Sequence, residues 1–90
     1  MRYQFSLSAT ILLLRTTPYF EEALRRRPGI LRRWCEEVAK NPEHTEIQSN
    51  GWSRRWGFVT EVQKYLRVIV LEDGETLHNA FFDRRYRGKQ

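Results

Sequence analysis

The stretch that most constrains the fold is residues 65–85, in which two runs of β-favouring residues flank the dipeptide Asp73-Gly74. Asp-Gly between two such runs is typical of a two-residue type I′ hairpin turn, because both central residues of that turn need φ > 0. We therefore predict an antiparallel β-hairpin centred on Asp73-Gly74.

A two-residue turn also determines which residues face each other, because side chains alternate between the two faces of a strand. The predicted pairs on one face are Val70 with Leu77, Val68 with Asn79 and Leu66 with Phe81, and on the other Ile69 with His78, Arg67 with Ala80 and Tyr65 with Phe82. The first face is mostly hydrocarbon and requires a covering layer. The second is expected to bring Arg67, His78, Tyr65 and Arg84 within reach of one another.

Two helices before the hairpin are predicted to form the covering layer. Thr17 and Pro18 mark the start of the first helix, with Thr as the cap and Pro in the first turn, and Pro28-Gly29 ends it. The second helix is predicted over residues 30–40 and stops at Asn41-Pro42. One apolar stripe runs along it, made of Ile30, Leu31, Trp34, Cys35, Val38 and Ala39.

The dipeptide Asn50-Gly51 predicts a second type I′ hairpin, which joins residues 45–49 to residues 52–62 and pairs Glu46 with Arg55. The next loop, near residues 61–64, is expected to place Phe58 opposite Arg67 and Trp56 opposite Ile69. That register sends Arg55 to the helix-covered face beside Val70, where an arginine is not expected. A bulge at Gly57 would turn Arg55 back towards the open face.

These elements predict an α+β fold: two N-terminal helices packed on one face of an antiparallel meander of about four strands. The chain has 90 residues, which suits a single domain. Residues 1–15 are interpreted as a strand-like extension that adds an extra N-terminal strand, residues 16–86 as the core and residues 87–90 as a tail.

Composition narrows the class of ligand. Sixteen Lys and Arg against eleven acidic residues give a net charge of +5, which favours a polyanion and makes RNA the first candidate partner. One cysteine and two separated histidines offer neither an internal disulfide nor a metal-ligand spacing, so we expect a reducing, cytoplasmic compartment and no cofactor. The apolar run at residues 11–14 is too short to span a bilayer, and we expect no membrane association.

The side chains gathered on the second face of the predicted hairpin match the requirements of metal-free RNA cleavage. That reaction needs a proton acceptor, a proton donor, cations for the charged phosphorane, and rings that stack a splayed base. The candidate catalytic residues are Arg67, His78, Arg84, Arg85 and Tyr86, and the candidate RNA-binding residues are Arg54, Arg55, Trp56, Phe58, Tyr65 and Phe82. The alternative for His78 is a packing role in the strand, and the whole set would merely bind RNA if the groups were not aligned.

The pattern of residues 26–85, "RRPGI…W…V..NPE…Q.NG…R.WG……KYLRV..LEDG.TLHNAF.DRR", resembles small members of the RelE/ParE superfamily of toxin–antitoxin ribonucleases and gyrase poisons. The resemblance implies helix–helix–meander order, a toxin-like endoribonuclease acting on mRNA, with or without the ribosome, and an acidic antitoxin as partner. It carries the catalytic role to Arg54 or Arg55, Arg67, His78, Arg84, Arg85 and Tyr86. Trp52 departs from the pattern, since Arg or Lys is expected after Asn50-Gly51, and the terminal helix of the superfamily is missing.

Three hypotheses follow from these features. The first is a toxin-like ribonuclease silenced by an acidic antitoxin segment. The second is a non-catalytic basic domain that uses the same face to bind RNA or a protein peptide. The third is a structural homodimer that forms when the N-terminal segments of two copies pair.

Overall fold

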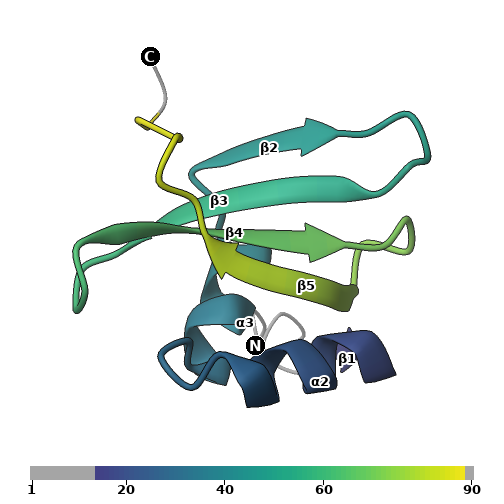
Figure 1. Ribbon diagram of the computed structural model, residues 1–90. Coiled ribbons are helices and arrows are strands. Elements are labelled where there is room, and N and C mark those ends of the chain that lie inside the picture. The colour runs from purple at the N-terminus through teal and green to yellow at the C-terminus, as the bar shows by residue number, and fades with distance from the viewer. Residues whose placement is uncertain (1–13, 89–90) are drawn as a thin grey trace, which may run out of the picture.

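The computed structural model describes residues 14–88 and shows an α+β fold with two helices and a five-stranded sheet (Figure 1). The elements are β1 (Arg15–Thr16), α2 (Pro18–Arg26), α3 (Arg32–Lys40), β2 (His44–Ile47), β3 (Ser53–Val59), β4 (Lys64–Val70) and β5 (Thr76–Phe82). The strands lie in the order β1-β5-β4-β3-β2, in which β2 to β5 form an antiparallel meander and β1 pairs with β5 in parallel. The predicted fold class is confirmed. Most of the predicted N-terminal strand, and the dimer built on it, lie outside the described residues.

Both helices lie on one side of the sheet and leave the other side open (Figure 1). Helix α2 packs on β5, and α3 packs on β3 and β4. The largest side chains buried completely between these layers are Phe20, Cys35, Leu66, Val68, Val70 and Leu77. The hydrocarbon face of the hairpin is thus covered, as the apolar stripe predicts.

The first helix begins where the sequence predicts. The Thr17 side chain accepts a hydrogen bond from the backbone N–H of Phe20 at 3.0 Å, and Pro18 occupies the first helical position. The second helix begins at Arg32, two residues later than predicted, because Leu31 has an extended backbone and serves as the cap. Ile30 is nevertheless buried, in the turn that precedes α3.

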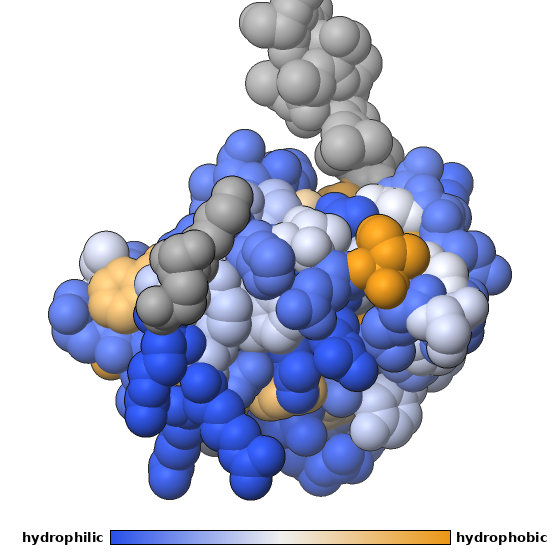
Figure 2. All heavy atoms as spheres, turned by 90° about the horizontal axis from the view of Figure 1, so that it is seen from above, coloured by the Kyte–Doolittle hydropathy of each residue, from blue (hydrophilic) through white to orange (hydrophobic). Residues whose placement is uncertain are grey.

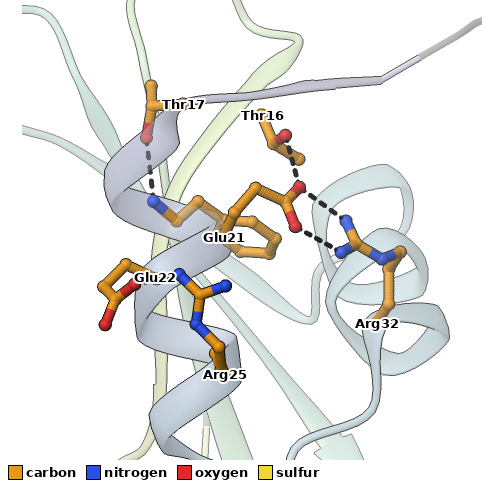
Figure 3. A network of polar contacts seen from close by, with 7 residues as sticks. Thr16, Thr17, Glu21, Glu22, Arg25 and Arg32 are labelled. Atoms are coloured by element: carbon orange, nitrogen blue, oxygen red, sulfur yellow. Dashed lines mark hydrogen bonds and ion pairs between the residues drawn. The ribbon is translucent and has the colours of Figure 1, made fainter.

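A carboxylate joins the two helices on their outer side (Figure 3). Glu21 of α2 accepts two hydrogen bonds from the Arg32 guanidinium of α3, at 2.5 and 2.9 Å, and one from the Thr16 hydroxyl at 2.6 Å. These hydrogen bonds, the Arg32 ones foremost, lower the pKa of Glu21 from 4.5 to about 2. The ionised carboxylate therefore orients α2 and α3 relative to each other.

The predicted register of the last hairpin is correct at Val70 and Leu77 and wrong beyond them. Ile69 pairs with Asn79, so His78 has no partner on β4 and forms a bulge. All later pairs shift by one residue: Val68 with Ala80, Arg67 with Phe81 and Leu66 with Phe82. Phe82 consequently packs with the helix-covered core instead of lying beside Tyr65 on the open face.

The predicted two-residue turn at Asp73-Gly74 is also wrong. Only Gly74 of the pair has a positive φ, +78°, and the connection is a wider loop closed by the Leu71 N–H to Thr76 carbonyl bond at 2.9 Å. The Asp73 carboxylate accepts the backbone N–H groups of Glu75 and Thr76, each at 2.9 Å. The Asp73 side chain thus accepts two backbone N–H groups that would otherwise need acceptors elsewhere.

The loops that join β2 to β3 and β3 to β4 also give registers that differ from the predicted ones. Residues 49–51 form a three-residue loop with Gly51 at φ +89°, so Glu46 pairs with Arg54 and the predicted pairing with Arg55 is wrong. Between β3 and β4 the register differs from the prediction by two residues, which places Trp56 opposite Arg67 and Phe58 opposite Tyr65. A shift of two keeps every side chain on its predicted face.

Gly57 lies in a regular part of the β3–β4 ladder, so the bulge proposed there to re-aim Arg55 is absent. A Cβ atom at position 57 would lie 2.8 Å from the Cγ2 of Val38 in α3. The glycine is therefore required for close packing of the helix on the sheet. It does not bend the strand.

Candidate nucleic-acid interface

The open side of the sheet carries a row of four side chains, one from each strand of the meander. The strand register places His44, Trp56, Arg67 and Phe81 side by side. The His44 and Trp56 rings stack with centroids 5.4 Å apart, and the Arg67 guanidinium lies 5.7 Å from the Trp56 ring and 4.4 Å from the Phe81 ring. Arginine between two aromatic rings is a surface on which another flat group can stack.

Residues 83–88 leave β5 and fold back over this row. Asp83 begins the segment: its backbone N–H bonds the Tyr65 carbonyl at 3.0 Å, and its carboxylate accepts the Trp56 indole N–H at 2.9 Å. The Tyr86 ring then lies almost parallel on the Trp56 ring, with centroids 4.9 Å apart and an interplanar angle of 14°. The Tyr65 ring meets Tyr86 edge-on at 4.8 Å. Trp56 is only 4% exposed as a result.

A cavity of about 370 Å³ opens beside this segment, where β4 begins and β5 ends. We call it the tail cavity. It is lined by four aromatic rings, three cations and two further polar residues: Phe58, Tyr65, Phe82, Tyr86, Lys64, Arg84, Arg87, Gln63 and Asp83. Phe58 is 42% exposed and meets the Tyr65 ring edge-on at 5.0 Å. The tail cavity thus combines exposed ring surface with positive charge.

Charge within the site is arranged around Asp83. Partial burial acts to raise the pKa of this carboxyl, but the bonds from Trp56 and the Arg85 N–H, together with the Arg67 charge, outweigh it and lower the pKa. The Arg67 Nε lies 3.7 Å from Asp83 and, within the described part of the chain, is buried without a hydrogen-bond acceptor. Burial, followed by the negative charge of Glu43, raises the pKa values of the Tyr65 and Tyr86 hydroxyls. Both hydroxyls are therefore protonated near neutral pH, and that of Tyr65 donates to the Glu43 carboxylate at 3.3 Å.

The structure brings together five of the eleven predicted site residues. Phe58, Tyr65, Phe82, Arg84 and Tyr86 all line the tail cavity. Trp56 lies directly beneath Tyr86, and Arg67 lies against the Trp56 ring. Phe82 reaches the cavity from the helix-covered side, where the Lys64 ammonium lies 5.1 Å from its ring. Arg85 lies in the same segment and is exposed. Its backbone N–H donates to the Asp83 carboxylate.

His78, which the predicted register brings within reach of Arg67, contacts Thr17, Tyr19 and Trp52 instead. The bulge places the imidazole between the Tyr19 and Trp52 rings, each 4.9 Å away, and its Nδ1 lies 3.0 Å from the Thr17 hydroxyl. Because the Thr17 oxygen already accepts from Phe20, its hydroxyl proton is available to Nδ1. This geometry fits the packing alternative for His78.

The two arginines of β3 also lie away from the tail cavity. Arg54 is on the open face, 3.7 Å from Glu46. Arg55 lies on the helix-covered face, where its guanidinium donates to the Ala39 carbonyl at 2.6 Å and to the Ser53 hydroxyl at 3.0 Å. Burial lowers the pKa of Arg55. Its bond to a carbonyl at the end of α3 is that of a helix C-terminal cap.

Sequence reasoning missed Lys64, Arg87 and His44 as members of the site. Arg87 belongs to the stretch predicted as a tail, but it lines the cavity and donates to the Arg84 carbonyl at 3.1 Å. Its position next to Tyr86, a predicted site residue, was the sequence feature that could have indicated a place in the site. His44 gave no signal, because its place on the open face depends on the three-residue loop that sets the β2–β3 register.

Figure 2 looks onto the open side of the sheet, and most of the visible atoms there belong to hydrophilic residues. This surface suits a polar or charged ligand better than an apolar one. Within residues 14–88, no cluster of three or more His, Cys, Asp or Glu side chains could hold a metal ion. The described helices are all too short or too polar to cross a membrane.

Comparison with known proteins adds no relative: no family model, curated protein or solved structure matches the chain.

Proposed function

We propose that this chain binds single-stranded RNA, and that the tail cavity and the row of side chains beside it form the binding surface. One observation carries the proposal: a single cavity combines the rings of Phe58 and Tyr65 with the charges of Lys64, Arg84 and Arg87. Single-stranded nucleic acid is bound by this combination, because bases stack on rings while cations contact the phosphates. Stacking contributes about 1–3 kcal/mol per base and is tolerant of sequence.

The side chains of the tail cavity support RNA binding without cleavage of the strand. Cleavage requires a group that accepts the 2′-hydroxyl proton. The two tyrosines of the cavity have raised pKa values, and Asp83 is occupied by Trp56 and the Arg85 N–H. His78, a candidate catalytic residue, is held by Thr17 and Tyr19 at another position.

Membership of the RelE/ParE superfamily is part of the same proposal. Two helices followed by an antiparallel meander is the element order that the resemblance implies, which supports RNA as the polyanion. An acidic antitoxin segment would compete with RNA for the same three cations of the tail cavity.

The test is titration of a fluorescently labelled, single-stranded RNA 12-mer with the wild type and an Arg84→Ala/Arg87→Ala variant. An Arg25→Ala/Arg26→Ala variant is the matched control, because it removes the same charge from α2. Losing two phosphate contacts should weaken binding and make the dependence of log Kd on log salt shallower by about 1.4 in the first variant only. Equal effects in both variants, or no binding by the wild type, would refute the proposal. Gel analysis of the same RNA after incubation tests the absence of cleavage.

A further inference from the structure

The contact between Tyr86 and Trp56 has the geometry of a base stacked on an indole. The two rings are nearly parallel at 4.9 Å, and Tyr65 closes one side edge-on. The His44 ring lies beside both, 5.4 Å from Trp56 and 6.0 Å from Tyr86. We call the surface beneath Tyr86, formed by His44, Trp56 and Tyr65, the Trp56 platform. A flat ring of the chain itself occupies this platform.

Tyr86 is attached to the platform mainly through its ring. Its hydroxyl is buried without a hydrogen-bond partner among the described residues, which is unfavourable for a polar group. No backbone–backbone hydrogen bond joins residues 86–88 to the sheet, whereas Asp83 is held by both its backbone and its carboxylate. The segment is therefore held by hydrogen bonds to Asp83, whose carboxylate also accepts the Arg85 and Tyr86 backbone N–H groups, while the Tyr86 side chain is held by ring contacts alone.

Charges of both signs lie around the platform. Its three rings contact the carboxylates of Asp83, Glu43 and Glu46, and cations lie beside them. The Arg67 guanidinium lies against the Trp56 ring, and the tail cavity with Lys64, Arg84 and Arg87 adjoins Tyr86. A nucleobase that replaced the Tyr86 ring would thus have cations within reach for the phosphates on either side of it. The cations of the tail cavity favour a base of a polyanion over the aromatic side chain of a neutral peptide.

We infer that the Trp56 platform is a second base-stacking position, and that Tyr86 fills it until a nucleobase of bound RNA displaces the tyrosine ring. This inference rests on the proposed function and adds a regulatory element to it. The apparent affinity for RNA is reduced by the fraction of time for which Tyr86 closes the platform.

Two variants at position 86 separate displacement from direct contact. Tyr86→Ala opens the platform and should tighten RNA binding about three- to tenfold, the ratio expected if the platform is free for roughly a tenth to a third of the time. Tyr86→Phe keeps the ring and removes the unpartnered hydroxyl, so it should bind RNA no more tightly than the wild type. If Tyr86→Ala binds RNA as the wild type does, or more weakly, the inference is wrong. Urea denaturation of each variant verifies that the fold is intact.

A second measurement uses adenosine, which has a base and no phosphate. Adenosine should shift the NMR signal of the Trp56 indole N–H in Tyr86→Ala at lower concentrations than in the wild type, and a Trp56→Phe variant assigns that signal. If RNA binds but adenosine reaches Trp56 in no variant, the second stacking position is refuted and the proposed function stands. If adenosine reaches Trp56 in Tyr86→Ala but RNA binds to no variant, the platform exists and the proposed function fails.

Discussion

The carboxylate of Asp83 accepts the indole N–H of Trp56 at 2.9 Å, and this bond fixes the start of the C-terminal segment to the centre of the sheet. Asp83 follows the last residue of β5, while Trp56 lies in β3, two strands away. The bond therefore directs residues 84–88 across the open face and places Tyr86 over the indole.

Asp83→Asn should loosen the C-terminal segment. The pKa of Asp83 lies below its ordinary value of 3.8 in the folded protein, so the ionised form stabilises the docked segment. That contribution is complete above the ordinary pKa and is lost as the pH falls through the lowered one. The NMR contact between Tyr65 and Tyr86, followed from pH 7 to pH 2, should fade in the wild type. In Asp83→Asn it should be weaker at pH 7, and a contact at pH 7 that is as strong in the variant as in the wild type would contradict this role.

Glu21→Gln should lower stability in a pH-dependent way. The pKa of Glu21 falls from 4.5 to about 2 on folding, so its contribution is present at pH 7 and disappears between about pH 4.5 and pH 2. Since the Glu21 side chain is 43% exposed, we expect a loss of under ~1 kcal/mol at pH 7. Urea denaturation of both proteins at pH 7 and pH 2 measures the difference, which should be much smaller at the lower pH. A difference that is equal at both pH values would show that charge on Glu21 is not the cause.

Gly57→Ala should destabilise the protein by about 1–3 kcal/mol, the usual range for overpacking a core. The new Cβ would lie 2.8 Å from the Val38 Cγ2 and force α3 away from β3. Gly29→Ala is the matched control, because a Cβ there meets nothing within 4 Å, and it should change stability by less than about 0.5 kcal/mol. Thermal denaturation that ranks the two variants equally would disprove the packing explanation.

Arg55→Met should cost about 2 kcal/mol of stability, because it removes charged hydrogen bonds to the Ala39 carbonyl and the Ser53 hydroxyl. Arg54→Met carries the same change of charge on the neighbouring residue. It should cost under ~1 kcal/mol, since the Arg54–Glu46 pair is exposed and 3.7 Å apart. Denaturant midpoints of the two variants give the comparison. A larger loss for Arg54→Met would mean that Arg55 does not cap α3.

The positions of the elements and the faces of most side chains were predictable, because they depend on local signals. Thr17 and Pro18 begin α2 through a cap and a fixed φ, which need no distant partner. Trp56 and Phe58 lie on the predicted open face although their register is wrong by two residues, since strand faces repeat with that period.

The sequence by itself therefore determined the α+β layering, the covered and open faces, and a group of rings and cations near the end of the last strand. The tertiary structure decided the register and which of those groups meet. The Asp73 carboxylate widened one loop, a bulge moved His78 to Thr17, and Asp83 bonded to Trp56 from two strands away. These outcomes depend on contacts between residues far apart in the chain, which neither periodicity nor turn propensity encodes.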